Sequence, residues 1–490
     1  MEILAPKTGI AQSAHVGFPN MRNLDITSIP GIVALNNILV KRSSATVTET
    51  INWVVRNPLV TTEVYAVGNT GIVYSSTDSG VTWAVLAGNT AGGAGQGLTV
   101  WKDYLFVPRA TAMDLYGPLS GTPAWRNSWA GLTMDTDALW HPLLVSRNDN
   151  KLYGGAGRFV FSIDEVTGQT FLWSNAATYT ATAQALDLPS PYRIKCMKEL
   201  GNNLMLGTWQ GVNLYDIRAA DIFPWDRSAV SFGQPISIDD YGVHAMENSG
   251  NSLTVLAGIS GTVRKSDGVN ATIVGQIPTD IRGGKYLEFY PGAICNYKNK
   301  IFFGTGQGGT TATPNQGIYS LSQTGQGSIL NMEHSVSTLS DGTTNPLKVT
   351  ALLPITRDTL LAGWRDNATY GLDLTTATSY LYTTDYAGYF ETPLYTVGTS
   401  LQLKKFTNIE FQLVRPLRTG EGIKIEYRDD LTATFTTLNT YSFTDFGAVV
   451  SRNSLFIAPI DIPACETIQL RVSLLGSSTT SPEVKSINLK

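Results

Sequence analysis

The chain has 490 residues, of which 42% are hydrophobic, and a mean hydropathy of −0.02, which exclude a disordered chain and a collagen-like repeat. Lys and Arg number 35 against 39 Asp and Glu, so the net charge of −4 excludes a large basic surface for nucleic acid. Many Gly, Pro, Tyr, Thr and Ser residues favour turns and strands. We therefore predict an all-β protein.

Neither a signal peptide nor a membrane span is predicted. The first residues lack the basic-then-apolar order of a secretory signal, and no stretch approaches the roughly 18 apolar residues of a spanning helix. We expect folding in a reducing, aqueous compartment.

Residues 1–60 precede the repeats described below. They contain a strand-like segment, Ile38-Leu-Val-Lys-Arg42. One strand of this region either completes the last repeat and closes a ring, which removes free sheet edges, or the extreme N-terminus is an arm that reaches a neighbouring subunit.

Residues 61–385 carry an internal repeat. A short apolar strand that usually closes on Gly occurs seven times, beginning at Tyr65, Tyr104, Leu152, Leu204, Val255, Ile301 and Leu360. The steps between these residues are 39, 48, 52, 51, 46 and 59, close to the length of a four-stranded propeller blade. The repeat predicts a seven-bladed β-propeller, or one of six or eight blades if a degenerate unit is counted differently.

In most units another Gly begins a second strand a few residues later, which is a hairpin pattern. The second unit departs from this pattern, because Val107-Pro-Arg109 stands where Gly is expected.

The first unit contains Ser76-Thr-Asp78-Ser-Gly80-Val-Thr82-Trp83, which fits S-x-D-x-G-x-T-W. This segment resembles the Asp-box of sialidases and other β-propellers, which implies a structural turn between the two outer strands of a blade. Asp78 can accept backbone N–H bonds, Gly80 can take a positive φ, and Trp83 can cover the seam between blades.

Residues 386–490 change character. Longer strands with period-two alternation follow one another from Ser400 to Leu489, which predicts an antiparallel β-sandwich with its own core.

Catalytic chemistry is weakly indicated. A glycoside hydrolase needs two facing carboxylates, for which Asp135/Asp137 and Asp239/Asp240 are candidates, although neighbouring acids are more often turn formers. A sialidase also needs a cluster of three arginines, for which Arg158, Arg193 and Arg264 are candidates. The Arg-Ile-Pro segment of those enzymes is absent from the N-terminal region. We expect no catalytic residue.

No cofactor or metal site is predicted. The four histidines, His15, His141, His244 and His334, are isolated, and Cys196, Cys295 and Cys465 show no metal-ligand spacing, so we interpret the cysteines as buried thiols. The stretches 154–157 and 304–309 are Gly-rich but lack a phosphate-binding pattern, and we interpret them as hairpin turns.

Six tryptophans have two interpretations. They fill gaps between blades or an intersubunit contact, which we favour, or they line sugar-binding clefts. They are Trp125, Trp129, Trp140, Trp209, Trp225 and Trp364.

The low charge, the abundant Thr, Ser, Asn and Gly, and the segment Met21-Arg-Asn-Leu-Asp25 ahead of a propeller resemble tail nozzle proteins of short-tailed bacteriophages. The resemblance implies a virion protein assembled in the host cytoplasm: a homohexameric tail nozzle or hub ring below the portal. Its partners would be portal, adaptor and fibre proteins, and the genome would cross its lumen during DNA ejection without specific binding.

Two other functions stay open. One is a virion receptor-binding or fibre-attachment protein whose sandwich recognises a host glycan. The other is a sialidase-like glycoside hydrolase with converging carboxylates in an axial pocket.

Overall fold

The computed structural model describes residues 2–4, 18–29, 31–42, 46–88, 93–135, 139–210, 220–228, 231–279, 286–307, 315–324, 327–335, 347–366, 369–376, 378–382, 385–399, 401–446 and 455–490. The chain forms two compact units. The propeller unit comprises Lys41–Gln316 and Thr344–Leu374, and the sandwich unit comprises Met1–Val40, Gly317–Thr343 and Thr375–Lys490.

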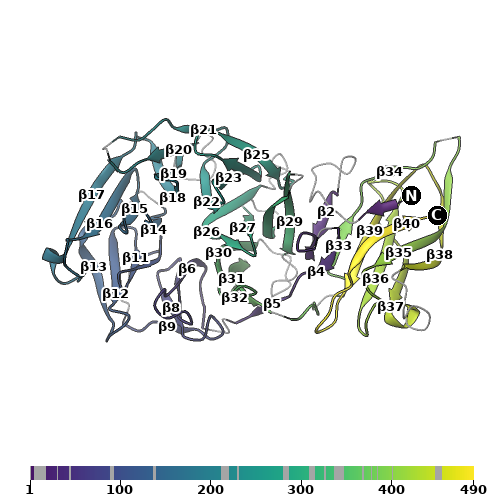
Figure 1. The fold of residues 1–490 in the computed structure, drawn as a ribbon, viewed down its shortest axis with the longest axis horizontal. Coiled ribbons are helices and arrows are strands. Elements are labelled where there is room, and N and C mark those ends of the chain that lie inside the picture. The colour runs from purple at the N-terminus through teal and green to yellow at the C-terminus, as the bar shows by residue number, and fades with distance from the viewer. Residues whose placement is uncertain are drawn as a thin grey trace. The chain divides into compact units, whose positions relative to one another are not determined.

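The propeller unit contains five successive four-stranded antiparallel sheets, which follow one another in chain order (Figure 1). The first two are β6 (Ile51–Arg56), β7 (Val64–Gly68), β8 (Val73–Ser76) and β9 (Ala84–Val85), then β10 (Thr99–Trp101), β11 (Tyr104–Pro108), β12 (Ala112–Gly117) and β13 (Ala124–Thr133). The third is β14 (Leu143–Val145), β15 (Leu152–Ala156), β16 (Phe159–Glu165) and β17 (Tyr179–Asp187), with the short helix η1 (Ala176–Thr178) before β17. The fourth and fifth are β18 (Tyr192–Leu200), β19 (Asn203–Gln210), β20 (Ala220–Trp225) and β21 (Ile236–Ile238), then β22 (Val243–Ser249), β23 (Ser252–Ala257), β24 (Thr262–Ser266) and β25 (Ala271–Gln276).

Two further groups of strands complete a ring. They are β26 (Leu287–Tyr297) with β27 (Lys300–Gln307), and β30 (Leu347–Pro354) with β31 (Leu360–Asp366) and β32 (Thr369–Thr375). The first strands β6, β10, β14, β18, β22, β26 and β30 each contact the next, and β30 contacts β6. This closed ring of sheets is a β-propeller. The number of blades stays a prediction, because β28 (Gly317–Thr324) and β29 (Gly327–Ser335), the two strands directly after β27, group with the sandwich unit.

An N-terminal strand lies at the end of this ring. In the sheet that contains β30, β31 and β32, the strand next to β32 is β5 (Leu39–Lys41). The backbone N–H of Arg42 donates to the carbonyl of Leu372 at 2.8 Å.

Apolar cores lie between consecutive sheets rather than within one sheet. Trp101 and Phe106 of the second sheet pack with Phe161 of the third, and Ile51 of the first packs with Leu361 of the last. Each sheet therefore depends on its two neighbours for burial of its faces.

The recurring glycines mark close approaches between strands. A Cβ added at Gly207 would lie 2.5 Å from Sγ of Cys196 and 2.7 Å from Cγ1 of Val243, which belong to the neighbouring strands β18 and β22. In the second sheet, Val107-Pro-Arg109 stands where Gly is expected. There the buried Arg109 binds Asp114 at 3.0 Å and donates to the carbonyl of Gly71 at 2.7 Å. The second sheet thus replaces close packing with a buried ion pair.

The sandwich unit contains two antiparallel sheets around one core. One has the order β1-β40-β35-β38, and the other has the order β2-β33-β39-β36-β37 with β34 also paired to β39 (Figure 1). The strands are β1 (Glu2–Leu4), β2 (Asn20–Arg22), β33 (Gly388–Glu391), β34 (Tyr395–Thr396), β35 (Lys404–Leu413), β36 (Gly422–Arg428), β37 (Thr436–Ser442), β38 (Leu455–Cys465), β39 (Thr467–Leu475) and β40 (Val484–Leu489). A one-turn helix, α1 (Phe443–Phe446), follows β37. Phe406, Phe411, Ile425 and Val472 lie in the shared core.

The N-terminal region also belongs to this unit, together with β3 (Leu24–Asp25), β4 (Ala34–Leu35), β28 (Gly317–Thr324) and β29 (Gly327–Ser335). Met21 pairs with Phe390, and the buried Asn23 donates to Oγ of Ser335 at 3.1 Å. The compact units therefore divide the chain differently from the predicted segments 1–60, 61–385 and 386–490.

Candidate functional site

Aromatic and charged side chains gather where the first strands of the propeller unit meet. Trp53 comes from β6, Trp140 from the segment before β14, and Tyr290 from β26. The ring centroids of Trp53 and Trp140 are 6.4 Å apart, and those of Trp140 and Tyr290 are 6.3 Å apart. We call this group the axial cluster; its members are Trp53, Trp140, Lys195, His244, Glu288, Tyr290 and Lys348.

Lys195 is the buried cation of the axial cluster. Its Nζ lies 2.5 Å from Nδ1 of His244, and it lies 5.8 Å and 5.3 Å from the ring centroids of Trp140 and Trp209. Burial lowers the pKa of Lys195 to about 8, although the charge of Glu288 opposes this shift. Burial, and then the charge of Lys195, lower the pKa of His244 well below its usual value.

Glu288 is the carboxylate of the axial cluster among the described residues. It accepts hydrogen bonds from Lys348 Nζ at 2.9 Å and from the hydroxyl of Tyr290. Burial and the adjacent Glu288 raise the pKa of Tyr290 well above its usual value. One carboxylate held by two donors does not form the opposed pair that glycoside hydrolysis requires.

Among the described residues, neither Asp135/Asp137 nor Asp239/Asp240 forms the opposed pair of carboxylates that a glycoside hydrolase needs. Asp240 accepts from the backbone N–H of Tyr241 at 2.9 Å, from Ser260 Oγ at 2.9 Å and from Thr262 Oγ1 at 2.7 Å, whereas Asp239 is exposed. Asp135 lies against Gly157, and Asp137 lies outside the described residues.

A recurring role for carboxylates at the hairpins was not predicted from the sequence. Glu49, Asp135 and Asp240 each precede the first strand of a sheet and approach a glycine, Gly68, Gly157 or Gly258, at the hairpin of that same sheet. Glu49 accepts hydrogen bonds from the backbone N–H groups of Thr70 and Ile72. Glu49 and Asp240 hydrogen-bond to their hairpins, and the weak sequence signal at the three positions is an acid that precedes the first strand of the sheet.

The predicted arginines occupy different structural positions. Arg158 lies in the β15–β16 turn and pairs with Asp187 at 3.1 Å, and Arg193 lies on the inner strand β18. Arg264 lies on the third strand of its sheet, in a pocket that also contains Asp239 and Asp240.

The histidines and cysteines are mainly buried. His141, His244 and His334 are at most 4% exposed, and His15 lies outside the described residues. All three cysteines are free and buried, as predicted. The described residues contain no group of three His, Cys, Asp or Glu side chains placed to hold a metal ion. In the same part of the chain, no helix has the length and apolar character that a membrane crossing requires.

The Gly-rich stretches lie in or beside strands. Residues 154–157 end β15 and enter its turn to β16, and residues 304–307 lie in β27. Residues 308 and 309 lie outside the described part of the chain.

The Asp-box segment forms a turn between β8 and β9. Oδ1 of Asp78 accepts from the backbone N–H groups of Val81 at 3.1 Å and Thr82 at 2.8 Å, and Oδ2 accepts from Thr82 Oγ1 at 2.6 Å. Ser76 Oγ accepts from the N–H of Gly80, whose φ is +84°. The Trp83 indole donates to the carbonyl of Gly80 at 3.0 Å and packs in the core between the first and last sheets. Every polar group named here serves the turn.

Most of the six tryptophans pack inside the propeller unit. Trp129, Trp209, Trp225 and Trp364 are at most 6% exposed. Trp125 donates to the carbonyl of Ala87 at 3.0 Å, and Trp140 belongs to the axial cluster. This burial supports the gap-filling interpretation over sugar-binding clefts for the four buried rings.

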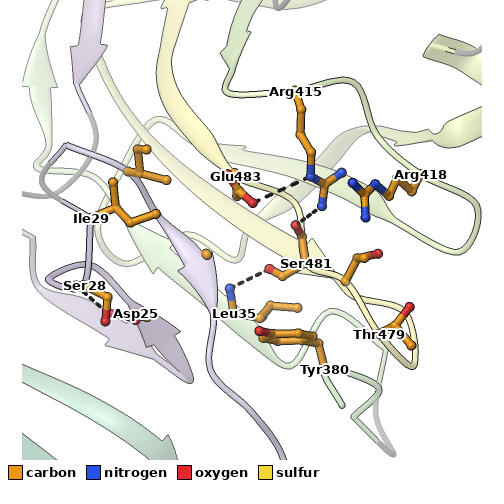
Figure 2. A pocket seen from close by; sticks show the side chains of 13 residues that line it. Asp25, Ser28, Ile29, Leu35, Tyr380, Arg415, Arg418, Thr479, Ser481 and Glu483 are labelled. Atoms are coloured by element: carbon orange, nitrogen blue, oxygen red, sulfur yellow. Dashed lines mark hydrogen bonds and ion pairs between the residues drawn. The ribbon is translucent and has the colours of Figure 1, made fainter. Parts of the chain in front are cut away.

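The sandwich unit has a pocket of about 390 Å³ (Figure 2). Arg415 at its wall is bound by Glu421 at 2.6 Å and by the carbonyl of Ser481 at 2.7 Å, while Arg418 is exposed. Tyr380 and the hydroxyl groups of Ser28, Thr479, Thr480 and Ser481 also line it. The pocket therefore offers hydrogen-bond donors, acceptors and an aromatic ring.

No protein-family model and no curated protein sequence matches the chain. Solved structures with a similar fold include the β-propeller domain of Cps50 (Swd1) from Myceliophteria thermophila, with 10% identity, a TM-score of 0.44 and coverage of 70% of this chain and 100% of that chain. YCF48 bound to D1 peptide has 11% identity, a TM-score of 0.44 and coverage of 74% of this chain and 100% of that chain. The RRP9 WD40 repeats have 13% identity, a TM-score of 0.45 and coverage of 69% of this chain and 99% of that chain. At these identities the similarity concerns the fold alone.

Proposed function

We propose that this protein is a structural, non-enzymatic subunit of a bacteriophage tail, which forms part of the nozzle or hub ring below the portal. The observation that carries the proposal is the axial cluster. A propeller enzyme or ligand-binding propeller often presents polar groups at its axis, whereas here Lys195, Glu288 and Lys348 bind other members of the cluster.

The packing of the axial cluster also supports a particular location for the genome. Trp53, Trp140 and Tyr290 pack together where the inner strands meet, so we place the DNA lumen between subunits of a ring and not along the axis of one propeller. The net charge of −4 suits a lumen wall that does not bind phosphate.

Exposed aliphatic residues on the sandwich unit support assembly. Leu455 is 46% exposed and Ile457 is 54% exposed, and both lie on β38, the end strand of its sheet. Clustered apolar side chains at a surface are typical of protein contacts. Pro459 and Pro463 lack backbone N–H groups and disfavour extension of the sheet, so we infer that β38 contacts its neighbour through side chains.

The test is assembly of purified protein with tail partners, measured by light scattering and negative-stain imaging. We expect a ring, and we expect Leu455→Asp with Ile457→Asp to weaken it. The control is Val269→Asp, because Val269 is 74% exposed but lies in a propeller turn. A wild-type protein that never joins a particle would contradict the proposal.

A second candidate function is recognition of a host glycan by the sandwich unit, and the pocket in Figure 2 favours it. Tyr380, Arg418 and the surrounding hydroxyl groups are suited to a sugar. Glycan-array binding that falls at least tenfold in Arg418→Ala, but not in the exposed propeller variant Arg357→Ala, would support this function. Equal binding by both variants would contradict it.

A further inference from the structure

A pocket of about 490 Å³ lies in the propeller unit beside the fifth sheet. The segment between β21 and β22 contributes Asp239, Asp240 and Tyr241, and β24 and β25 contribute Arg264 and Ile273. This volume lies within the range of small-molecule sites in proteins.

Arg264 is the unusual residue of this pocket. It is only 8% exposed, and its Nε is buried without a hydrogen-bond partner. Within the described residues, no hydrogen bond or ion pair reaches its guanidinium group. Because a buried N–H donor is costly to leave without an acceptor, the Nε of Arg264 points to a ligand with acceptor oxygens.

The two carboxylates of the pocket differ in availability. Asp240 is held by Tyr241 N–H, Ser260 and Thr262, as described above. Asp239 is exposed at the rim, where it can accept hydrogen bonds from a ligand.

Charge then selects the class of ligand. Two negative side chains, Asp239 and Asp240, against one positive side chain, Arg264, give the pocket a charge of −1. An anionic ligand would gain from Arg264 but would be repelled by the two carboxylates. Hydroxyl groups satisfy both partners, because each can accept from a guanidinium and donate to a carboxylate. Tyr241 and the 56%-exposed Ile273 add apolar surface for the C–H face of a sugar ring.

We propose that this pocket binds a neutral saccharide, with Arg264 donating to ring or hydroxyl oxygens and Asp239 accepting from hydroxyl groups. The pocket is a separate site from the sandwich pocket of Figure 2, and its occupancy does not depend on the tail assignment.

The test is saturation-transfer NMR titration of the full chain with glucose, galactose, mannose, N-acetylglucosamine and lactose, and with glucuronate as the anionic comparison. We expect saturable binding of at least one neutral sugar, weaker binding of glucuronate than of glucose, at least a tenfold rise in Kd for Arg264→Gln, and a smaller rise for Asp239→Asn. Arg158→Gln is the matched control, because Arg158 is a partly exposed propeller arginine that lies outside this pocket and pairs with Asp187.

Three results would overturn the proposal. They are an absence of saturable binding of every neutral sugar, unchanged Kd values in both pocket variants, and tighter binding of glucuronate than of glucose. If Arg264→Gln fails to fold, Asp239→Asn decides the question, because a change at this exposed side chain leaves the core intact.

Discussion

Lys195 Nζ lies 2.5 Å from Nδ1 of His244, and both side chains are buried in the axial cluster. While Lys195 carries its charge, its ammonium group can only donate, so Nδ1 of His244 is then the acceptor and must be unprotonated. Two inner strands, β18 and β22, are thereby joined by a polar contact in an aromatic environment.

This contact predicts a pH-dependent difference in stability between the wild type and Lys195→Met. The pKa of Lys195 is about 8 in the folded protein and 10.5 is its ordinary value, so the unfolded chain binds more protons between these pH values. The free energy of unfolding of the wild type should therefore rise relative to that of the variant between pH 8 and 10, by at most about 1.4 kcal/mol per pH unit.

Chemical denaturation followed by tryptophan fluorescence at several pH values measures this difference. Lys198→Met is the control, because Lys198 lies on the same strand but its side chain is 31% exposed and pairs with Glu247. If the free energies of unfolding of the wild type and Lys195→Met changed in parallel with pH, burial would not lower the pKa of Lys195, and the prediction would be wrong.

The Asp-box turn predicts a loss of stability in Asp78→Ala. The substitution removes the acceptor for Val81 and Thr82, which should lower the free energy of unfolding by about 1–2 kcal/mol. Asp78→Asn keeps one acceptor oxygen and should lose less. Urea denaturation measures both variants, and equal stability of wild type and Asp78→Ala would contradict a structural role.

The same carboxylate predicts an acid dependence. Burial opposes the shift, but hydrogen bonds from Thr82, Ser76 and Val81 together lower the pKa of Asp78 below 3.8. The stabilisation that the Asp78 carboxylate gives the folded protein is therefore complete above pH 3.8. It is lost as the pH falls through the lower pKa of Asp78 in the folded state. The difference between wild type and Asp78→Ala should shrink in acid, which the denaturation series at pH 5 and below will show.

Close packing predicts that Gly207→Ala is destabilising. The new methyl group would lie 2.5 Å from Cys196 Sγ and 2.7 Å from Val243 Cγ1, so we expect a cost of about 1–3 kcal/mol. Gly121→Ala is the control, because its nearest contact would be 3.3 Å, to Cγ of Pro118. Similar melting temperatures for the two variants would argue against close packing at Gly207.

The buried ion pair of the second sheet predicts that removal of one charge is much more destabilising than removal of both. Asp114→Ala leaves the guanidinium of Arg109 buried without its carboxylate and should cost about 3–5 kcal/mol. The double variant Arg109→Met with Asp114→Leu removes both charges and should recover much of this loss. A double variant that is less stable than Asp114→Ala would contradict this account.

Local patterns predicted the fold more completely than the site. The recurring glycines made the repeated hairpins visible in the sequence, because a side chain at such a position would clash with neighbouring strands, as at Gly207. The pairing of Met21 with Phe390 joins residues 369 positions apart, and no local pattern encodes it. The axial cluster was missed for the same reason, since Lys195, His244 and Glu288 lie on different strands about 50 residues apart and meet only when the ring closes. Arg264 and Asp240 were singled out from the sequence in separate roles, and the structure places both in one pocket.

The most direct test of the central claim is the mass of the protein in solution, with and without tail partners, by light scattering with negative-stain imaging. The account predicts a ring of about six copies, formed alone or on its partners. A persistent monomer of 52.9 kDa that joins no particle would contradict it.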